Sequence, residues 1–378
     1  MISFKTYKEN PMYSYLVLLV VVSAAAFQGW RTLFNNYAVD VVGVNAVQIG
    51  AIQSVREIPG FFTFFVVYFL LIFAEHRFAA LAVMLLGIGV VLAGILPSFG
   101  GLMFTTVIMS VGFHFFETAN QSLTLQYFSR ERVPLVLGKM KSFLALANVS
   151  VGLLIWGLSE YLPMRYLFCG VGSIAIAGGI FALTKNPVNK LLPVQKKRLV
   201  FKRKYWLFYV LNFLSGARRQ IFVVFAVFIL VEKYHFSVMH IAVLFVINNV
   251  ISFFLSPYVG RAINRFGERA LLTVEYVSLT IVFLGYALVE NKEIVTVFYL
   301  IDNLFFSFSI AINSYFQKNA EPADIAPSMS VGFTINHITA VILPVVGGIF
   351  WTYNWRIPFL GGAFLSLCSL VFARMIKQ

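Results

Sequence analysis

The chain has 378 residues, of which 60% are apolar and 12% are charged, and its formal net charge is +14. This composition excludes a water-soluble enzyme, because a soluble fold of this length cannot cover so many apolar side chains. Apolar stretches of about 20 residues, the length that crosses a bilayer as a helix, follow one another along nearly the whole sequence. The composition therefore predicts an all-α membrane protein with many spans.

Short polar breaks divide the sequence into twelve predicted transmembrane helices. They lie at residues 40–46, 75–77, 97–100, 129–141, 160–163, 185–204, 232–236, 260–268, 290–293, 318–327 and 353–354. Most Lys and Arg residues fall in the amino-terminal arm, the even-numbered breaks and the carboxyl-terminal tail, so by the positive-inside rule both termini face the cytoplasm. The positive charge thus indicates orientation and attraction to anionic lipids at the cytoplasmic face, and it gives no support for nucleic-acid binding.

The two halves of the sequence resemble each other at an offset of 187 to 192 residues. Gly29-Trp30-Arg31 aligns with Gly216-Ala217-Arg218, Tyr127-Phe128 with Tyr315-Phe316, and Gln48 with His240. The common order of these weak matches indicates a parallel internal repeat. We expect a six-helix bundle at residues 1–184, a basic cytoplasmic linker at 185–204 and a second six-helix bundle at 205–378.

The twelve spans, the repeat and the charged central linker resemble the major facilitator superfamily over the whole chain. The most specific local match is Gly260-Arg261-Ala262-Ile263-Asn264-Arg265-Phe266-Gly267-Glu268-Arg269, which is similar to the family's loop signature with Asn264 in place of an aspartate. The equivalent segment of the first half, residues 73–77, lacks both the glycine and the aspartate. The resemblance implies two pseudo-symmetric bundles that rock around a midplane site. It also implies a gate at Gly260, Asn264, Arg265, Gly267 and Arg269.

Only four of the 29 Lys and Arg residues fall within predicted spans, and the others are placed in loops and tails. A charge inside the membrane needs water or a partner, so such residues mark a polar cavity by default. The four are Arg31, Arg56, Arg218 and Arg219, and the acids at similar depth are Glu57, Glu117, Glu275 and Asp302. For Arg56 beside Glu57 we favour a structural ion pair.

Polar residues three, four or seven positions apart share one face of a helix, and spans 1, 4, 7 and 10 carry such stripes. In the resembled family, these four spans line the central cavity. We therefore expect substrate to contact residues on these stripes, namely Gln28, Arg31, Asn35, Gln121, Arg218, Arg219 and Asn313.

The arginines on these stripes favour an anionic substrate. Arg31 and Arg218 are equivalent in the repeat, and two guanidinium groups can bind a carboxylate or phosphate through paired hydrogen bonds. The sequence predicts a secondary transporter of a small organic or phosphorylated anion. Coupling to protons needs a group that changes its protonation, and Glu117, His114 and Asp302 are the candidates.

Two alternatives stay open at this point. The first is a proton-coupled exporter of amphipathic cations or of a divalent metal, in which the arginines are structural. The second is a non-transporting membrane receptor of the same fold.

Patterns for other kinds of site are missing from the sequence. No nucleophile and base occur at useful spacing on the polar stripes, so we expect no enzyme and no catalytic residue. Cys169 and Cys368 lie far apart and outside any Cys/His cluster, so we expect neither a dedicated metal site nor a cofactor. We expect a monomer in a bacterial inner membrane, whose partners are the substrate, a coupling ion and anionic lipids.

Overall fold

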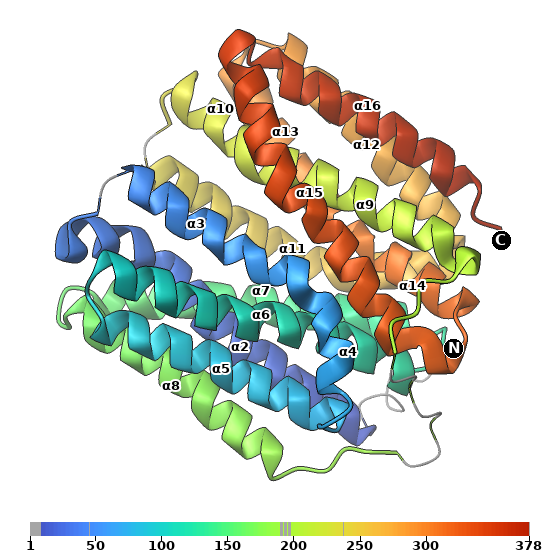
Figure 1. Ribbon diagram of the computed structural model, residues 1–378. Helices are drawn as coiled ribbons and strands as arrows, with labels where there is room; N and C mark the ends of the chain where they lie inside the picture. Colours follow the sequence, from blue (N-terminus) through green and yellow to red (C-terminus); the bar gives the residue numbers. More distant parts are fainter. Residues whose placement is uncertain are drawn as a thin grey trace. The chain divides into compact units, whose positions relative to one another are not determined.

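Helices form all of the regular secondary structure in the described part of the chain (Figure 1). The computed structural model describes residues 9–44, 46–189, 192, 195, 198–236 and 238–377. A helix satisfies its own backbone hydrogen bonds, which is the condition for crossing a bilayer. Eleven helices of the described residues are long and apolar enough to cross a membrane. With the divided helix that begins at Ala46 and ends at Phe69, they make twelve helical segments in this part of the chain.

The chain divides into two compact units. Unit 1 comprises the described residues of Met1–Ser129, Phe143–Val200 and Pro322–Ser330, and unit 2 comprises Arg130–Ser142, Phe201–Glu321 and Val331–Gln378. Helix α7 (Val133–Leu158) and helix α15 (Ile325–Tyr353) each contribute residues to both units. The predicted boundaries at residues 184 and 205 stay a prediction, because Lys190 and its neighbours in the linker lie outside the described residues.

Unit 1 contains the helices of the first half of the chain. They are α2 (Pro11–Asn36) with the π-helical turn η1 (Tyr37–Val42), α3 (Ala46–Phe61) with η2 (Phe62–Phe65) and α4 (Val66–Phe69), α5 (Glu75–Ile95), α6 (Phe99–Tyr127), most of α7 and α8 (Met164–Leu183). The short 3-10 turn η6 (Pro322–Asp324) also belongs to it.

Unit 2 contains the helices of the second half. They are η3 (Arg203–Tyr205), α9 (Trp206–Gln220) with the π-helical turn η4 (Ile221–Ala226) and α10 (Val227–Glu232), α11 (Val238–Phe266), α12 (Glu268–Leu288), α13 (Lys292–Phe306) with η5 (Ser307–Ser309) and α14 (Ile310–Asn319), most of α15, and α16 (Arg356–Arg374). Helix α12 packs against α16 and α13.

Small residues allow the helices of unit 1 to approach closely. Helix α5 packs between α6 and α8 (Figure 1), and Gly87 of α5 faces Gly172 of α8. A methyl group at Gly172 would lie 2.7 Å from the carbonyl oxygen of Gly87. Interfaces of this kind bring helix backbones together where apolar side chains gain nothing by leaving lipid.

The α5–α8 contact gives a matched pair of substitutions on one helix. Gly172→Ala should lower stability by about 1–3 kcal/mol because the added methyl group overpacks the interface. Gly170→Ala, where nothing lies within 4 Å of the new methyl group, should change stability by less than about 1 kcal/mol. Thermal unfolding of the purified protein in detergent measures both, and equal losses for the two variants would contradict the close approach.

Candidate functional site

A buried ion pair joins α9 to α12 in unit 2. Nη1 of Arg218 lies 3.3 Å from Oε1 of Glu275, and the two side chains are only 4% and 6% exposed. The Arg218 guanidinium also lies over the ring of Tyr276, 4.2 Å from its centroid. Because each charge neutralises the other, the pair lowers the cost of placing either one inside a membrane helix bundle.

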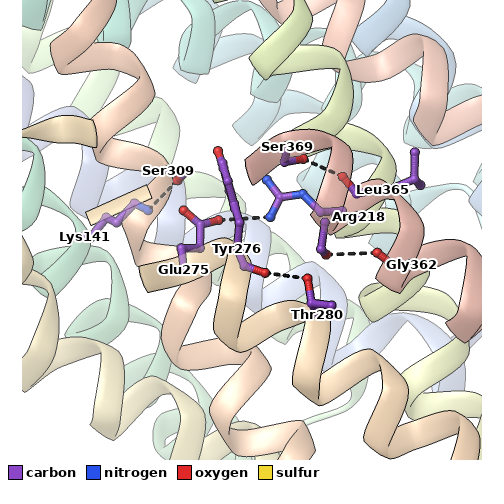
Figure 2. A network of polar contacts seen from close by, with 10 residues as sticks. Lys141, Arg218, Glu275, Tyr276, Thr280, Ser309, Gly362, Leu365 and Ser369 are labelled. Carbon is purple, nitrogen blue, oxygen red and sulfur yellow. Dashed lines mark hydrogen bonds and ion pairs between the residues drawn. The ribbon is translucent and has the colours of Figure 1, made fainter. Parts of the chain in front are cut away.

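Lys141 and Asp302 extend this pair into a group of four charged residues, here called the unit-2 charge cluster. Lys141 donates from Nζ to Oγ of Ser309 at 3.1 Å, and its charge interacts with that of Glu275. Figure 2 shows Glu275 between Lys141 and Arg218. Asp302 of α13 is buried and interacts electrostatically with Arg218 and Glu275. The cluster therefore combines two basic and two acidic side chains.

Several buried polar atoms of the cluster and of Arg219, the next residue of α9 after Arg218, have no hydrogen-bond partner among the described residues. They are Nε of Arg218, Oε2 of Glu275, Oδ2 of Asp302, and Nε and Nη2 of Arg219. Nε and Nη2 lie along one edge of a guanidinium, and such an edge can bind a carboxylate or phosphate through two parallel hydrogen bonds. Arg219 therefore offers a donor pair suited to an anion.

The position of Lys141 corrects the sequence analysis, which placed residues 129–141 in a loop. Helix α7 begins at Val133, so Lys141 lies inside the helix. The segment packs closely in spite of its charge: Ser142 donates from Oγ to the carbonyl of Phe253 at 2.6 Å, and a methyl group at Gly138 would overlap the backbone of Ser256. Small residues thus allow this part of α7 to pack closely against α11. This packing places Lys141 within hydrogen-bonding distance of Ser309.

Glu275 is the functional candidate that sequence reasoning left out of the site. The sequence placed it at membrane depth, but it falls on none of the polar stripes. Its pairing depends on how α12 is rotated against α9, and the spacing within one helix does not report that rotation. The available signal was its rarity as an acid within an apolar span.

The polar residues predicted in unit 1 lie on α2, α3 and α6. Arg56 and Glu57 form an ion pair at 2.6 Å, with side chains 22% and 23% exposed. The hydroxyl of Ser110 donates to the Arg56 carbonyl. A carboxylate oxygen of Glu57 and a ring nitrogen of His114 lie within 4.8 Å of each other.

The predicted substrate contacts are distributed over both units. Arg31 and Asn35 are exposed on α2, and Gln28 donates to Oγ1 of Thr32 at 3.3 Å. The remaining members of the stripes, Glu117, Gln121 and Asn313, are half-buried. Because Arg31 belongs to unit 1 and Arg218 to unit 2, the two-arginine fork stays a prediction.

The segment that matches the loop signature is mostly helical. Helix α11 continues to Phe266 and α12 begins at Glu268, so Gly267 alone makes the turn, with a φ of 81°. That conformation favours glycine. Asn264 donates from Nδ2 to the carbonyl of Glu131, and a methyl group at Gly260 would overlap the carbonyl of Pro134. These contacts hold the start of α7 against the end of α11.

The remaining residues of the expected gate flank this turn. Arg265 lies over the ring of Phe266, 5.1 Å from its centroid, and the Arg269 carbonyl accepts a hydrogen bond from Thr273 at 2.7 Å. A gating role for this segment stays a prediction.

Comparison with known proteins decides the family. The model of the Major Facilitator Superfamily matches residues 16–337. The chain belongs to the Major Facilitator Superfamily. Family membership and the apolar helices make it an integral membrane protein, and the family and fold are those of membrane transporters. No protein of curated function matches the sequence.

Solved structures of superfamily transporters share the fold of this chain at low sequence identity. The human organic anion transporter MFSD10 is similar with a TM-score of 0.80 and 10% identity, covering 96% of this chain and 99% of its own. The E. coli fucose:proton symporter FucP is similar with a TM-score of 0.78 and 14% identity, and the match covers 97% of this chain and 98% of FucP. A bacterial homologue of the iron transporter ferroportin is similar with a TM-score of 0.73 and 14% identity, and the match covers 96% of this chain and 98% of the homologue. At these identities the likeness shows the fold alone.

The buried pair of this superfamily member gives a test of its energetics. Glu275→Ala should destabilise the protein by about 3–5 kcal/mol, because it removes the ion-pair partner of the buried Arg218. Glu57→Ala, at the more exposed pair with Arg56, should cost less.

The double variant Arg218→Met/Glu275→Leu should recover much of the loss, because it removes both charges and keeps apolar volume. Thermal unfolding of the double variant and of its two components, Arg218→Met and Glu275→Leu, measures the coupling. Strictly additive losses would contradict the ion pair.

Proposed function

We propose that this protein is a secondary transporter that works by alternating access and moves a small organic or phosphorylated anion with protons. The observation that carries the proposal is the unpartnered Nε–Nη2 edge of Arg219, the residue that follows Arg218 in α9. Within the cluster, Arg218 and Lys141 can offset Glu275 and Asp302 in charge. Arg219 is then the surplus cation, and it forms no ion pair with a described residue.

A surplus guanidinium in a half-buried position favours an anionic ligand. Burying a charge with unmatched donors costs free energy that a carboxylate or phosphate can offset through two charge-assisted hydrogen bonds. The proposed contacts also include the predicted stripe residues of unit 2, Arg218 and Asn313. The predicted contacts on unit 1, namely Gln28, Arg31, Asn35 and Gln121, stay a prediction.

Asp302 is the coupling group that the geometry supports best. Its side chain is buried, its Oδ2 has no partner among the described residues, and it shares the positive field of Arg218 with Glu275. A proton on Asp302 removes one negative charge from the cluster and makes the region around Arg219 more positive. Proton binding and anion binding therefore favour each other, and by linkage the effect is reciprocal. Glu117 and His114 are the alternative coupling groups.

A second candidate function follows from Glu57 and His114 of unit 1. A carboxylate oxygen and an imidazole nitrogen within 4.8 Å of each other are a donor combination that divalent transition metals accept. An exporter of a divalent metal would use these residues and leave the arginines as structural groups. The same binding experiment separates the two functions.

Arg219→Gln should abolish anion binding, and Arg219→Lys should weaken it, because lysine lacks the planar donor pair. The measurement is thermal stabilisation of the purified protein by a panel of phosphate esters, carboxylates, organic cations and divalent metals. A ligand at about 100 times its Kd should stabilise the wild type by roughly 2.7 kcal/mol. Arg374→Gln, at an exposed arginine of α16, is the control. Stabilisation by a metal or cation in wild type and Arg219→Gln alike, with none by anions, would overturn the anion proposal.

Asp302→Asn should separate binding from coupling. Because asparagine cannot take up the proton, the variant should still exchange labelled anion across liposome membranes but fail to accumulate it when a proton gradient is imposed. Glu293→Gln, at an exposed acid on the same helix, should behave like the wild type. Gradient-driven accumulation that persists in Asp302→Asn would move the coupling group elsewhere, with Glu117 and His114 tested next.

A further inference from the structure

The same polar arrangement occurs once in each unit, at the start of α5 and at the start of α12. Glu75, the first residue of α5, accepts a hydrogen bond from Nε2 of Gln126 at 2.7 Å and interacts with the hydroxyl of Ser122, both on α6. Glu268, the first residue of α12, accepts a hydrogen bond from Ser314 of α14 at 2.6 Å.

Lys318 completes the arrangement in unit 2. Its Nζ lies 2.7 Å from Oε1 and 2.9 Å from Oε2 of Glu268. The three pairs of equivalent positions, Glu75 with Glu268, Ser122 with Ser314 and Gln126 with Lys318, are 192 or 193 residues apart in the sequence. The starts of α5 and α12, and those of α6 and α13, are likewise 193 residues apart. The helices of the structure thus give this equivalence, which differs from the match of Tyr127 with Tyr315 at 188 residues in the sequence.

The two copies differ in one charge. Where Glu268 has the ammonium group of Lys318, Glu75 has the neutral amide of Gln126. That amide also donates to Oγ of Ser122, at 2.8 Å. The second carboxyl oxygen of Glu75, Oε1, is buried and has no hydrogen-bond partner among the described residues. None of the described cations lies within ion-pairing distance of Glu75.

The ionisable groups that the structure describes around Glu75 do not supply the missing charge. Arg77 on the same helix has an exposed side chain. His76 is buried and packs edge-on against the ring of Tyr15 of α2, with 6.1 Å between the ring centroids. On α6, Tyr127 interacts electrostatically with Glu75 but is neutral when protonated. Lys185, beyond the end of α8, lies over the ring of Phe181.

An ionised Glu75 would therefore place a full negative charge against neutral donors, with one oxygen left bare in a buried position. Desolvating an unpaired carboxylate is costly, and a proton removes that cost. A metal ion does not fit equally well, because hard cations need several oxygen ligands and the described contacts of Glu75 are an amide N–H and a hydroxyl.

We propose that Glu75 is a proton-binding site, whose carboxyl group holds a proton where its repeat partner Glu268 holds the ammonium group of Lys318. The site lies in unit 1 and is separate from the unit-2 charge cluster. It therefore does not depend on the proposed substrate or on Asp302 as the coupling group.

Infrared spectroscopy of the purified full-length protein tests the proposal directly. A protonated carboxyl group has a C=O absorption distinct from that of a carboxylate. The wild-type spectrum should contain one such absorption. It should be missing in Glu75→Gln, which removes the carboxyl group, and in Gln126→Lys, which supplies the missing ammonium group. Glu268→Gln is the matched control and should retain it. A protonated-carboxyl region that is identical in wild type and Glu75→Gln would overturn the proposal.

The ionic composition of the buffer separates a proton from a sodium ion. Replacing sodium with choline should leave the Glu75 absorption unchanged. If the absorption appears only after sodium is removed, the site binds sodium, and the proposal of a proton-binding site would be overturned.

Thermal stability provides a second measurement on the same variants. Glu75→Gln should melt within about a degree of the wild type, because glutamine resembles the protonated acid in shape and charge. Glu268→Gln should lower the melting temperature by more than Glu75→Gln does, because Lys318 and Ser314 lose their charged partner. If the melting temperature falls as far in Glu75→Gln as in Glu268→Gln, and the infrared spectrum is unchanged, then Glu75 is ionised in the folded protein.

Discussion

Compensation of buried charge is the constraint on which the polar interior of this protein depends. The Arg218–Glu275 pair shows it most clearly, since both side chains are nearly inaccessible and neither could be buried alone at reasonable cost. The pair also fixes how α9 and α12 are rotated against each other. The stacking of the guanidinium over Tyr276 adds an attraction that does not consume its remaining donors.

Compensation is incomplete at a few positions, and the proposed anion and proton sites lie at these positions. Glu275 and Arg218 satisfy each other only in part, and Asp302 and Arg219 retain buried polar atoms without partners among the described residues. A protein that only needed stability could replace such groups with apolar residues of similar volume, often without loss. Their presence in spans that are otherwise rich in Phe, Leu and Val is consistent with the proposed anion and proton, which would complete them.

Much of the fold follows from the sequence alone, because the length of apolar stretches and the distribution of Lys and Arg depend on the bilayer. The helical segments and the family were accessible in this way, and both are confirmed. The prediction of a loop at Lys141 was wrong, because a lysine close to other polar residues has the local composition of a loop. The pairing of Arg218 with Glu275 could not be predicted either, since that contact depends on the mutual rotation of two helices far apart in the chain.

Irregular helix geometry limits prediction of the site in a second way. A prediction that Asp302 and Asn313 share one helix face assumes a continuous α-helix, but the 3-10 turn Ser307–Ser309 interrupts the span. Because a 3-10 turn contains fewer residues than an α-helical turn, it shifts the faces of α13 and α14 relative to each other. The π-helical turn Ile221–Ala226 has the opposite effect on the span that contains Arg219. Spacing arguments therefore hold within each helical segment and weaken across these junctions.

The internal repeat places two different solutions to the same electrostatic problem in one chain. Glu75 and Glu268 occupy the same position in their units and share a serine at the same place on the neighbouring helix. One residue, Gln126 or Lys318, decides whether the partner of the carboxyl group is a neutral amide or a fixed cation. A fixed cation locks the two helices together at every pH at which both groups are charged, whereas a bound proton can leave. Divergence between the repeats thus offers a route by which a symmetric scaffold acquires a proton-responsive residue in one half while the other half keeps a permanent ion pair.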